Sequence, residues 1–405
     1  MKLLFLAAEP PCALEHNGAS QNLLDIIKHL HGRHEISLLT FCSSREEATQ
    51  APALKPFCHH VDTVLLRLPG KHHWKLRFRT LLTGRPSFVT ICESIEMKRK
   101  LVELTRREAF DVIQFQGIYM APYVDAIPRP RVAATVLHEI ELNVVRLYRD
   151  FKAAGSPAAK AYRLKDWLNM VSFEPAACGK FDRVIVCCGQ DQHVLTAYDP
   201  TINTAVIPFG VDDALFDIES GTDDGTRLVF LGSYRHPPNV DGALFFANEI
   251  LPMVREQLPA VTLSLVGGSP PESIRELARH DGVEVTGYVE DLTAHLKSAA
   301  VCVAPVRYGA GQKTKVLTAM AAAKPVVSTR LGIESLDAVP GRDLLVADEP
   351  QEFAGQIVRL LRDPGLRRSI GEHGRRLAQH RYSWRKNVVL LEQIYQDIRA
   401  RSARA

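Results

Sequence analysis

Short apolar runs alternate with longer segments of helical length along most of the chain. The runs span four to eight residues and are rich in Val, Leu and Ile. Alternation of this kind is typical of parallel sheets whose strands are joined by helices. We therefore predict an α/β fold with strands at Lys2–Ala7, Glu35–Phe41, Thr63–Leu68, Asp111–Gln116, Arg131–His138 and Arg183–Cys188, then at Arg227–Ser233, Thr262–Gly267, Val283–Tyr288, Val301–Val306, Pro325–Thr329 and Leu344–Ala347.

The alternation breaks near Ile207–Gly225. This stretch combines turn-forming and acidic residues without apolar periodicity, so we expect an interdomain linker there. Each half then forms a doubly wound domain, in which ligands bind at the carboxyl ends of the strands. Close to the end of the sequence, apolar residues at helical spacing predict an amphipathic helix over Trp384–Ile398.

The composition is that of an ordinary globular protein of two or three domains, with 405 residues of which 46% are hydrophobic. A net charge of +4 is too small to indicate nucleic-acid binding, but it fits anionic small molecules or lipid headgroups. The eight cysteines contain no C-x-x-C pair, and paired residues such as His72–His73 and Cys187–Cys188 lack a third metal ligand. No apolar run approaches the roughly 18 residues of a membrane span, so we expect a cytoplasmic protein.

The segment Ala304–Gly332 carries the clearest chemistry. It reads as a strand, a glycine-containing turn, an Ala-rich helix and a further strand. Gly309 and Gly311 allow close approach of the backbone to a ligand, and the following helix offers free N–H groups to an anion. Helical spacing separates Lys313 from Lys315, so we do not expect the two amines to bind the same oxygen. The alternative is an ordinary βαβ unit with solvated lysines.

Four stretches in this order resemble retaining glycosyltransferases of the GT-B fold, specifically glycosyltransferase family 4 (group 1), and within it a subgroup of exopolysaccharide and cell-surface glycan assembly. The resemblance covers nearly the whole chain. The stretches are Asn17–Ala19, Val206–Asp212, Phe230–Gly232 with His236–Asp241, and the Ala304–Gly332 segment with its continuation to Glu334.

The resemblance implies two doubly wound Rossmann-like domains that face each other across a cleft. Residues 1–206 would bind the acceptor, 207–226 would form the linker, 227–384 would bind a nucleotide-diphosphate sugar, and a helix at 385–405 would cross back to the first domain. It also implies that no cofactor and no metal is required. The partners would be the nucleotide-sugar donor and a glycan, lipid-linked or small-molecule acceptor, with peripheral association at the inner face of the cytoplasmic membrane as a further expectation.

The resemblance also assigns site residues. Lys313 and Lys315 would neutralise the donor diphosphate, and Arg235 would replace one charge of an Arg and Lys pair that many members carry. Gly18 would let backbone amides meet the diphosphate, although it also fits an ordinary turn glycine. The remaining donor-binding candidates are Gly232, Asn239, Tyr288, Val289, Gly309, Gly311, Thr314, Thr318 and Glu334.

Two positions depart from the family pattern. Most members carry two glutamates eight positions apart, where this chain has Ala310 and Thr318. The second glutamate binds the ribose hydroxyls, and a threonine lacks its charge and bidentate reach, so ribose binding should be weaker or supplied by Glu334.

Other candidates keep a structural alternative. His138 ends a strand and can contact the sugar or acceptor, with Glu139 or Glu141 beside it, or it can be a core histidine. Asn239 fits either a ligand contact or a helix N-cap. The basic segment Lys71–Leu82 can lie on an anionic membrane or pack on its own domain.

These observations predict a retaining, metal-independent glycosyltransferase that moves a sugar from a nucleotide diphosphate to an acceptor hydroxyl. Catalysis would rest on positioning and charge stabilisation. The loss of the carboxylate at Thr318 leaves a noncatalytic GT-B subunit of a glycan-assembly complex as the alternative. An epimerase or phosphorylase would need acid/base groups or a cofactor lysine context that the sequence does not display.

Overall fold

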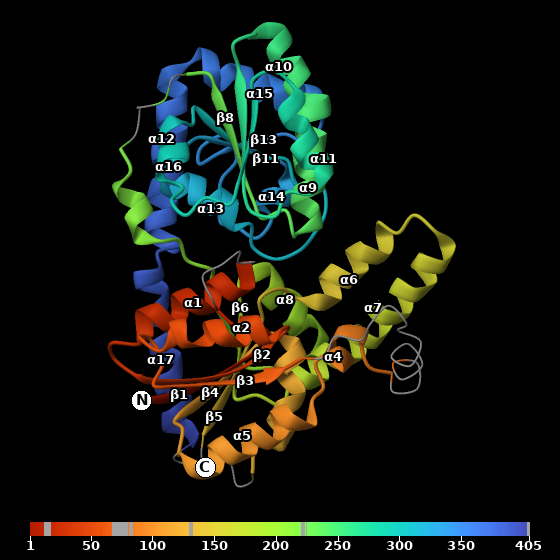
Figure 1. The fold of residues 1–405 in the computed structure, drawn as a ribbon, viewed down its shortest axis with the longest axis vertical. Coiled ribbons are helices and arrows are strands. Elements are labelled where there is room, and N and C mark those ends of the chain that lie inside the picture. Colours follow the sequence, from red (N-terminus) through yellow and green to blue (C-terminus); the bar gives the residue numbers. More distant parts are fainter. Residues whose placement is uncertain are drawn as a thin grey trace. The chain divides into compact units, whose positions relative to one another are not determined.

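The computed structural model describes residues 1–11, 18–66, 80, 84–128, 133–219, 223 and 225–402. The chain divides into two compact units. Ala19–Pro208, with the first strand and the segment from Val388 onward, forms the first unit, and Phe209–Asn387 forms the second. Each unit is a parallel sheet covered by helices (Figure 1).

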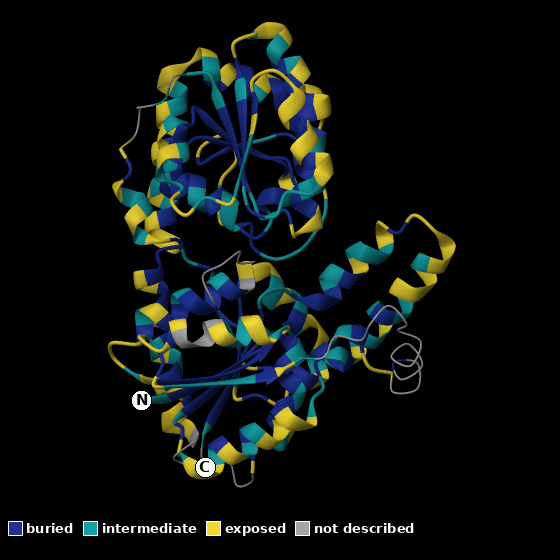
Figure 2. Cartoon of the chain, in the orientation of Figure 1, coloured by how far each residue is buried: buried dark blue, intermediate teal, exposed yellow. Residues whose placement is uncertain are grey.

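The first unit holds a seven-stranded sheet in the order β3-β2-β1-β4-β5-β6-β7, in which every pair is parallel. The central strands are buried almost throughout, because helices cover both faces (Figure 2). The strands are β1 (Lys2–Ala7), β2 (Glu35–Cys42), β3 (His60–Leu65), β4 (Val112–Gln116), β5 (Ala134–His138), β6 (Arg183–Val186) and β7 (Thr204–Val206).

Local signals fix several helices of this unit. Ser94 caps α5 by accepting the N–H of Met97 at 3.3 Å, and Ser156 caps α7 with Pro157 as its first residue. The helices are α1 (Gly18–Leu30), α2 (Arg45–Gln50), α4 (Ser87–Ile91), α5 (Ile95–Arg107), α6 (Asn143–Lys152), α7 (Pro157–Cys178), α8 (Gly189–Tyr198) and the C-terminal α17 (Trp384–Ser402).

Helix α17 contributes to both units. Trp384 packs against Gly210 in the second unit, where a Cβ would lie 2.5 Å from the indole. From Val388 onward the helix belongs to the first unit, where Tyr395 is fully buried and its hydroxyl donates to Gln114 of β4. Glu392 accepts from Arg33 and His34 at 2.6 Å each.

The second unit holds a six-stranded parallel sheet in the order β10-β9-β8-β11-β12-β13. Chain order reverses between β8 and β11, as it does between β1 and β4 in the first unit. The carboxyl ends at such a reversal are where doubly wound sheets bind ligands. The strands are β8 (Arg227–Leu231), β9 (Thr262–Val266), β10 (Val283–Gly287), β11 (Val301–Ala304), β12 (Val326–Ser328) and β13 (Leu345–Val346).

Two apolar clusters pack on opposite faces of this second sheet, one around Phe246 and Phe353 and the other around Leu317 and Met320. The helices that supply them and cover the sheet are α9 (Pro237–Phe245), α10 (Leu251–Gln257), α11 (Glu272–Arg275), α12 (Thr293–Ser298), α13 (Thr314–Ala321), α14 (Arg330–Ile333), α15 (Pro350–Arg362) and α16 (Pro364–Arg381).

Every strand expected from the sequence has a counterpart, and the two Rossmann-like sheets are confirmed. The short edge strand β7 was not expected, because its three half-buried residues form no apolar run. Asn17 and most of the Lys71–Leu82 segment lie outside the described residues.

Candidate functional site

The first part of the candidate site is the junction between β8 and α9. Gly232 follows β8 directly, and a Cβ at this position would lie 2.8 Å from Nδ2 of Asn239 and 3.2 Å from Nζ of Lys315. Glycine is therefore required for the two side chains to occupy this position. The N-cap residue of α9 is His236, and Asn239 is the third residue of the helix. Asn239 therefore does not cap the helix. Its Nδ2 instead donates to the carbonyl oxygen of Ser233 at 2.7 Å.

The amine of Lys315 completes this cluster from α13. It donates to Oδ1 of Asn239, and it lies 4.7 Å from the centroid of the Phe230 ring. Burial, and then repulsion from Lys313, lower the pKa of this amine from 10.5 to about 7. None of these contacts is a carboxylate, which would favour the protonated amine.

Lys313 precedes α13 and points back to the turn before it. Its Nζ donates to the carbonyl oxygens of Ala310 and Gly311 at 2.8 Å each, and the residue is 8% exposed. Gly309 and Gly311 adopt φ values of 111° and 72°, which favour glycine. The two lysines thus take different contacts, as the helical spacing predicts, but they are close enough for their charges to interact.

The same turn is fixed from its other side by Gln312. Its side chain accepts from the N–H of Phe209 at 2.9 Å and donates to the carbonyl oxygen of Phe209 at 3.2 Å. This reciprocal pair anchors the turn that carries both lysines. Thr314 begins α13, and Thr318 lies one turn further along in a half-buried position.

The other donor candidates lie at strand ends of this second sheet. Arg235 is exposed and its Nε donates to Oγ of Ser269 at 3.2 Å. Tyr288 follows β10 and is 49% exposed, while the neighbouring Val289 packs against the apolar cluster around Leu317. Glu334 follows α14 and is half-buried.

In the first unit, His138 belongs to a buried network of polar side chains at the ends of β4 and β5. Its Nδ1 lies 3.3 Å from Nε2 of Gln114, which also donates to Gln116 at 3.2 Å; Gln116 in turn donates to Asn22 of α1 at 3.1 Å. Burial lowers the pKa of His138 to about 4, so the ring is neutral. Its Nε2 has no hydrogen-bond partner in the described part of the chain.

Glu139 turns into the core. The residue is 1% exposed, one carboxyl oxygen faces Sγ of Cys178 at 3.9 Å, and burial raises its pKa well above the usual range. The acceptor contact expected of Glu139 stays a prediction, and in this structure the carboxyl group is enclosed by the core. The next acid on this face, Glu174 of α7, is also fully buried and accepts the first N–H groups of α6, those of Asn143 and Val144, at 2.8 Å each.

Two further candidates, Glu141 and Gly18, are more open. Glu141 pairs with Nε of Arg146 at 3.0 Å. Gly18 is the first residue of α1, is exposed, and has no atom within 4 Å of an added Cβ. The protein itself therefore does not require glycine at that position.

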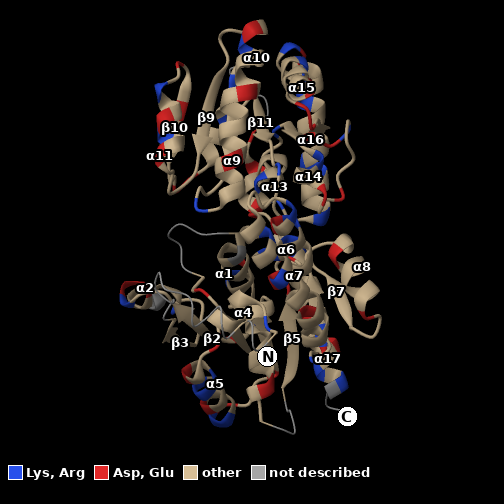
Figure 3. Cartoon of the chain, turned by 90° about the vertical axis from the view of Figure 1, so that its right-hand side faces the viewer, with Lys and Arg blue, Asp and Glu red and all other residues tan. Residues whose placement is uncertain are grey.

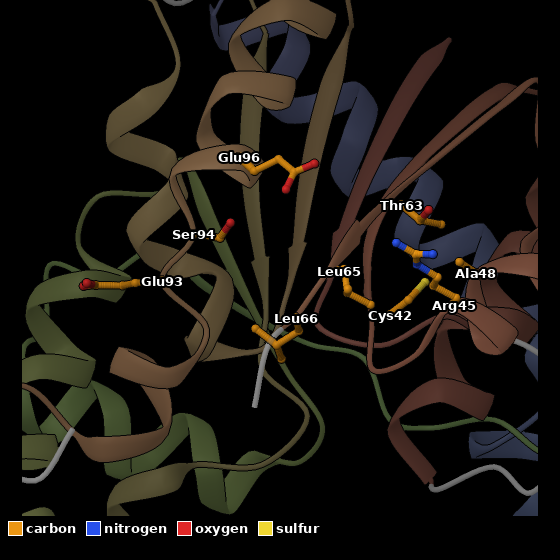
Figure 4. A pocket seen from close by; sticks show the side chains of 9 residues that line it. All are labelled: Cys42, Arg45, Ala48, Thr63, Leu65, Leu66, Glu93, Ser94 and Glu96. Atoms are coloured by element: carbon orange, nitrogen blue, oxygen red, sulfur yellow. The ribbon is translucent and has the colours of Figure 1, made fainter. Parts of the chain in front are cut away.

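A pocket of about 590 Å³ opens at the carboxyl ends of β2 and β3 (Figure 4). It is lined by charged and hydroxyl side chains, among them Arg45, Thr63, Ser94 and Glu96, with Leu65 on its apolar side. None of the residues singled out in the sequence lines it.

Five residues that contact the site residues or hold them in place were not expected from the sequence. They are Phe230, whose ring faces the Lys315 amine, Gln312, and the hydrogen-bonded series Asn22, Gln114 and Gln116. The glutamines had a signal, because polar residues alternate in VIQFQ on an otherwise apolar strand that ends at the ligand-binding edge. Phe230 stands in one of the stretches that carry the resemblance, but its contact with Lys315 and the pairing of Gln312 with Phe209 had no signal, because these partners lie far apart in sequence.

Among the described residues, no three His, Cys, Asp or Glu side chains are grouped as a metal site would require. In the same part of the chain, every helix is too short or too polar to cross a membrane.

Comparison with known proteins places these features in context. Residues 225–363 match the family described as "Glycosyl transferases group 1". The chain is 31% identical over 372 residues to the MMP alpha-(1->4)-mannosyltransferase of Mycolicibacterium hassiacum. This match covers 89% of this chain and 88% of that protein.

Solved structures share the fold at lower identity. Sucrose-phosphate synthase from Thermosynechococcus elongatus matches with a TM-score of 0.71 and 19% identity, covering 99% of this chain and all of that one. Anabaena HepE in complex with UDP and glucose matches with a TM-score of 0.67 and 17% identity, covering 98% of this chain and 99% of that one.

Proposed function

The chain belongs to the group 1 glycosyltransferases, and from this premise we propose that it is a retaining family 4 enzyme that moves a sugar from a nucleoside diphosphate to an acceptor hydroxyl. The observation that carries the proposal is the Lys315 amine, which lies among Asn239, Gly232 and Phe230 with no carboxylate partner among its contacts. A diphosphate supplies the missing negative charge. We assign this cluster to the donor diphosphate.

The reaction needs charge stabilisation more than it needs a base. The bond between the anomeric carbon and the diphosphate oxygen breaks, and a bond to the acceptor oxygen forms on the same face of the sugar. The acceptor proton passes to the departing diphosphate. Lys315, Lys313 and Arg235 would stabilise the charge that develops on this leaving group, and no metal ion is required in this scheme.

Recognition of the nucleoside follows from neighbouring positions. We propose that Tyr288 and Val289 border the base and that Glu334 contacts the ribose, because Thr318 stands where a carboxylate is expected. The HepE structure contains UDP, and the Mycolicibacterium relative is a mannosyltransferase, so uridine and guanosine diphosphates are the first nucleotides to test. The acceptor would be a glycan or glycoconjugate in polysaccharide synthesis, held by the first unit.

The test combines ligand binding with turnover. A nucleoside diphosphate should raise the melting temperature of the protein in the presence of EDTA, because a ligand that binds only the folded state stabilises it. Lys315→Ala should lose this shift and reduce transfer by roughly a hundredfold or more, the usual range for one donor to a developing anion. Lys386→Ala, at an exposed lysine of the same unit, serves as the control and should leave both unchanged.

Equal turnover in Lys315→Ala would exclude the assigned role, and binding that requires added metal would exclude the metal-free scheme. Thr318 favours one alternative, a noncatalytic subunit of a glycan-assembly complex. In that case the native chain would bind no donor, and Thr318→Glu would restore measurable affinity.

A further inference from the structure

Helices α6 and α7 form a hairpin that extends away from the first sheet (Figure 1). The hairpin consists of Asn143–Lys152, Pro157–Cys178 and the four residues that join them. It leaves the sheet after β5, at the carboxyl edge where a doubly wound domain binds its ligand. The base of the hairpin therefore lies at this edge, and its far half extends away from the sheet.

Side-chain contacts join the two helices of the hairpin. Trp167 of α7 lies 5.1 Å from the ring of Tyr148 and stacks on Phe151 with an interplanar angle of 2°. Nη1 of Arg163 donates to the carbonyl oxygen of Asp150 at 3.0 Å and ties the second helix to the first. A surface built this way can dock without first becoming ordered, which lowers the cost of binding.

Charge on the far half of the hairpin has one predominant sign. Residues 148–165 contain five basic side chains and one acidic side chain, and Lys and Arg mark both helices in Figure 3. Lys152 and Lys160, on either side of the tip, are exposed and have no ion-pair partner in the described part of the chain. The basic residues are Arg149, Lys152, Lys160, Arg163 and Lys165.

Much of the far half of the hairpin is exposed (Figure 2), and large apolar and amphipathic side chains are among its exposed residues. Tyr148 is 43%, Tyr162 is 40% and Leu168 is 52% exposed. Tyrosine favours the headgroup region of a bilayer, and lysines beside it attract anionic lipids. The hydroxyl of Tyr162 donates to Oγ of Ser87 at 2.8 Å, so Tyr162 offers the edge of its ring. The exposed positive charges of Lys152 and Lys160 beside these side chains are complementary to the anionic surface of a bilayer.

We propose that the far half of the α6–α7 hairpin docks on an anionic membrane surface. The inference rests on the proposed glycosyl transfer, because the purpose of docking would be to hold the first unit beside a lipid-linked acceptor. The two can fail separately, because vesicle binding requires no donor and donor binding requires no vesicle.

The experiment is co-sedimentation of the full-length protein with vesicles of phosphatidylcholine alone and with vesicles that contain about one third phosphatidylglycerol. We expect binding to the anionic vesicles that weakens as salt is added. Lys152→Glu with Lys160→Glu should lower the partition coefficient by more than about tenfold, because each lysine near such a surface is worth about a fivefold change in binding.

The matched control reverses two exposed arginines of α16, with Arg368→Glu and Arg376→Glu, and so makes the same change in net charge elsewhere. It should keep most of the binding. Equal binding to neutral vesicles, an equal loss in both double variants, or no binding to either vesicle would overturn the proposal. The thermal shift with a nucleoside diphosphate should be unchanged in the hairpin variant, which keeps failure of docking distinct from failure of the donor site.

Discussion

At Lys315, the surrounding residues set the chemistry of the side chain. Burial and the charge of Lys313 lower the pKa of its amine to about 7, so in the free protein the amine is about half protonated near neutral pH. A bound diphosphate favours the ammonium form and raises this pKa. Ligand binding above pH 7 must then take up a proton, and it weakens as the pH rises.

We therefore expect the dissociation constant of the nucleoside diphosphate to rise by roughly ten- to a hundredfold between pH 7 and pH 9. Over this range the terminal phosphate of the ligand can only gain negative charge, so a loss of affinity reports on the amine. Isothermal titration calorimetry in two buffers measures both the affinity and the proton uptake. Lys315→Met should bind weakly at pH 7 and show little pH dependence. A constant affinity in the native protein over this range would contradict the assigned contact.

At the scale of the element, the start of α6 depends on Glu174 of the neighbouring α7. Its carboxylate accepts the N–H groups of Asn143 and Val144, while burial raises its pKa from 4.5 to about 7. The folded state thus holds this proton more tightly than the unfolded state. The contribution of Glu174 to stability is largest below about pH 4.5, falls as the pH rises through 7, and is constant above that.

Glu174→Gln should remove this part of the pH dependence, which amounts to a change of roughly 1–3 kcal/mol in the free energy of unfolding. It should also destabilise the hairpin at every pH, because an amide offers one acceptor where the carboxylate offers two. Urea unfolding between pH 5 and 8, followed through tryptophan fluorescence, measures both effects. Glu372→Gln, at an exposed glutamate on α16, should show the native slope; an unchanged slope in Glu174→Gln would refute the assignment.

At the scale of the whole molecule, α17 begins in the second unit and continues into the first. Its residues from Val388 onward are part of the first unit. Tyr395 is fully buried there and its hydroxyl donates to Gln114. Tyr395→Ala should cost about 3–5 kcal/mol, as expected for a large buried aromatic side chain. The loss should be local to the first unit.

Hydrogen exchange measured by mass spectrometry tests this localisation. Peptides from β1 and β4 should exchange faster in Tyr395→Ala, whereas peptides from β8 and β11 should keep their native rates. Val389→Ala, at a 45% exposed position of the same helix, should change neither set. Faster exchange in both units would show that they unfold together.

The sequence was sufficient to predict the elements of this protein because their signal is local. Apolar runs such as LLFLA and the spacing of glycines before Lys313 are readable without a partner, and the expected strands and the helix beginning at Trp384 are confirmed. Patterns of this kind arise from the period of each element and from burial on one or both faces.

The contacts of the site were decided by the tertiary structure. Asn239 and Lys315 are 76 residues apart and Tyr395 and Gln114 are 281 apart, so the sequence could not show that they are hydrogen-bonded. Glu139 and Glu141 look alike in the sequence, yet one is buried in the core and the other pairs with Arg146. The sequence by itself determined which residues form strands, helices and phosphate-compatible turns, because backbone preference and hydrophobic period are local properties. Which charges are paired, neutral or free was decided only by the fold, because burial and distance set the pKa of each group.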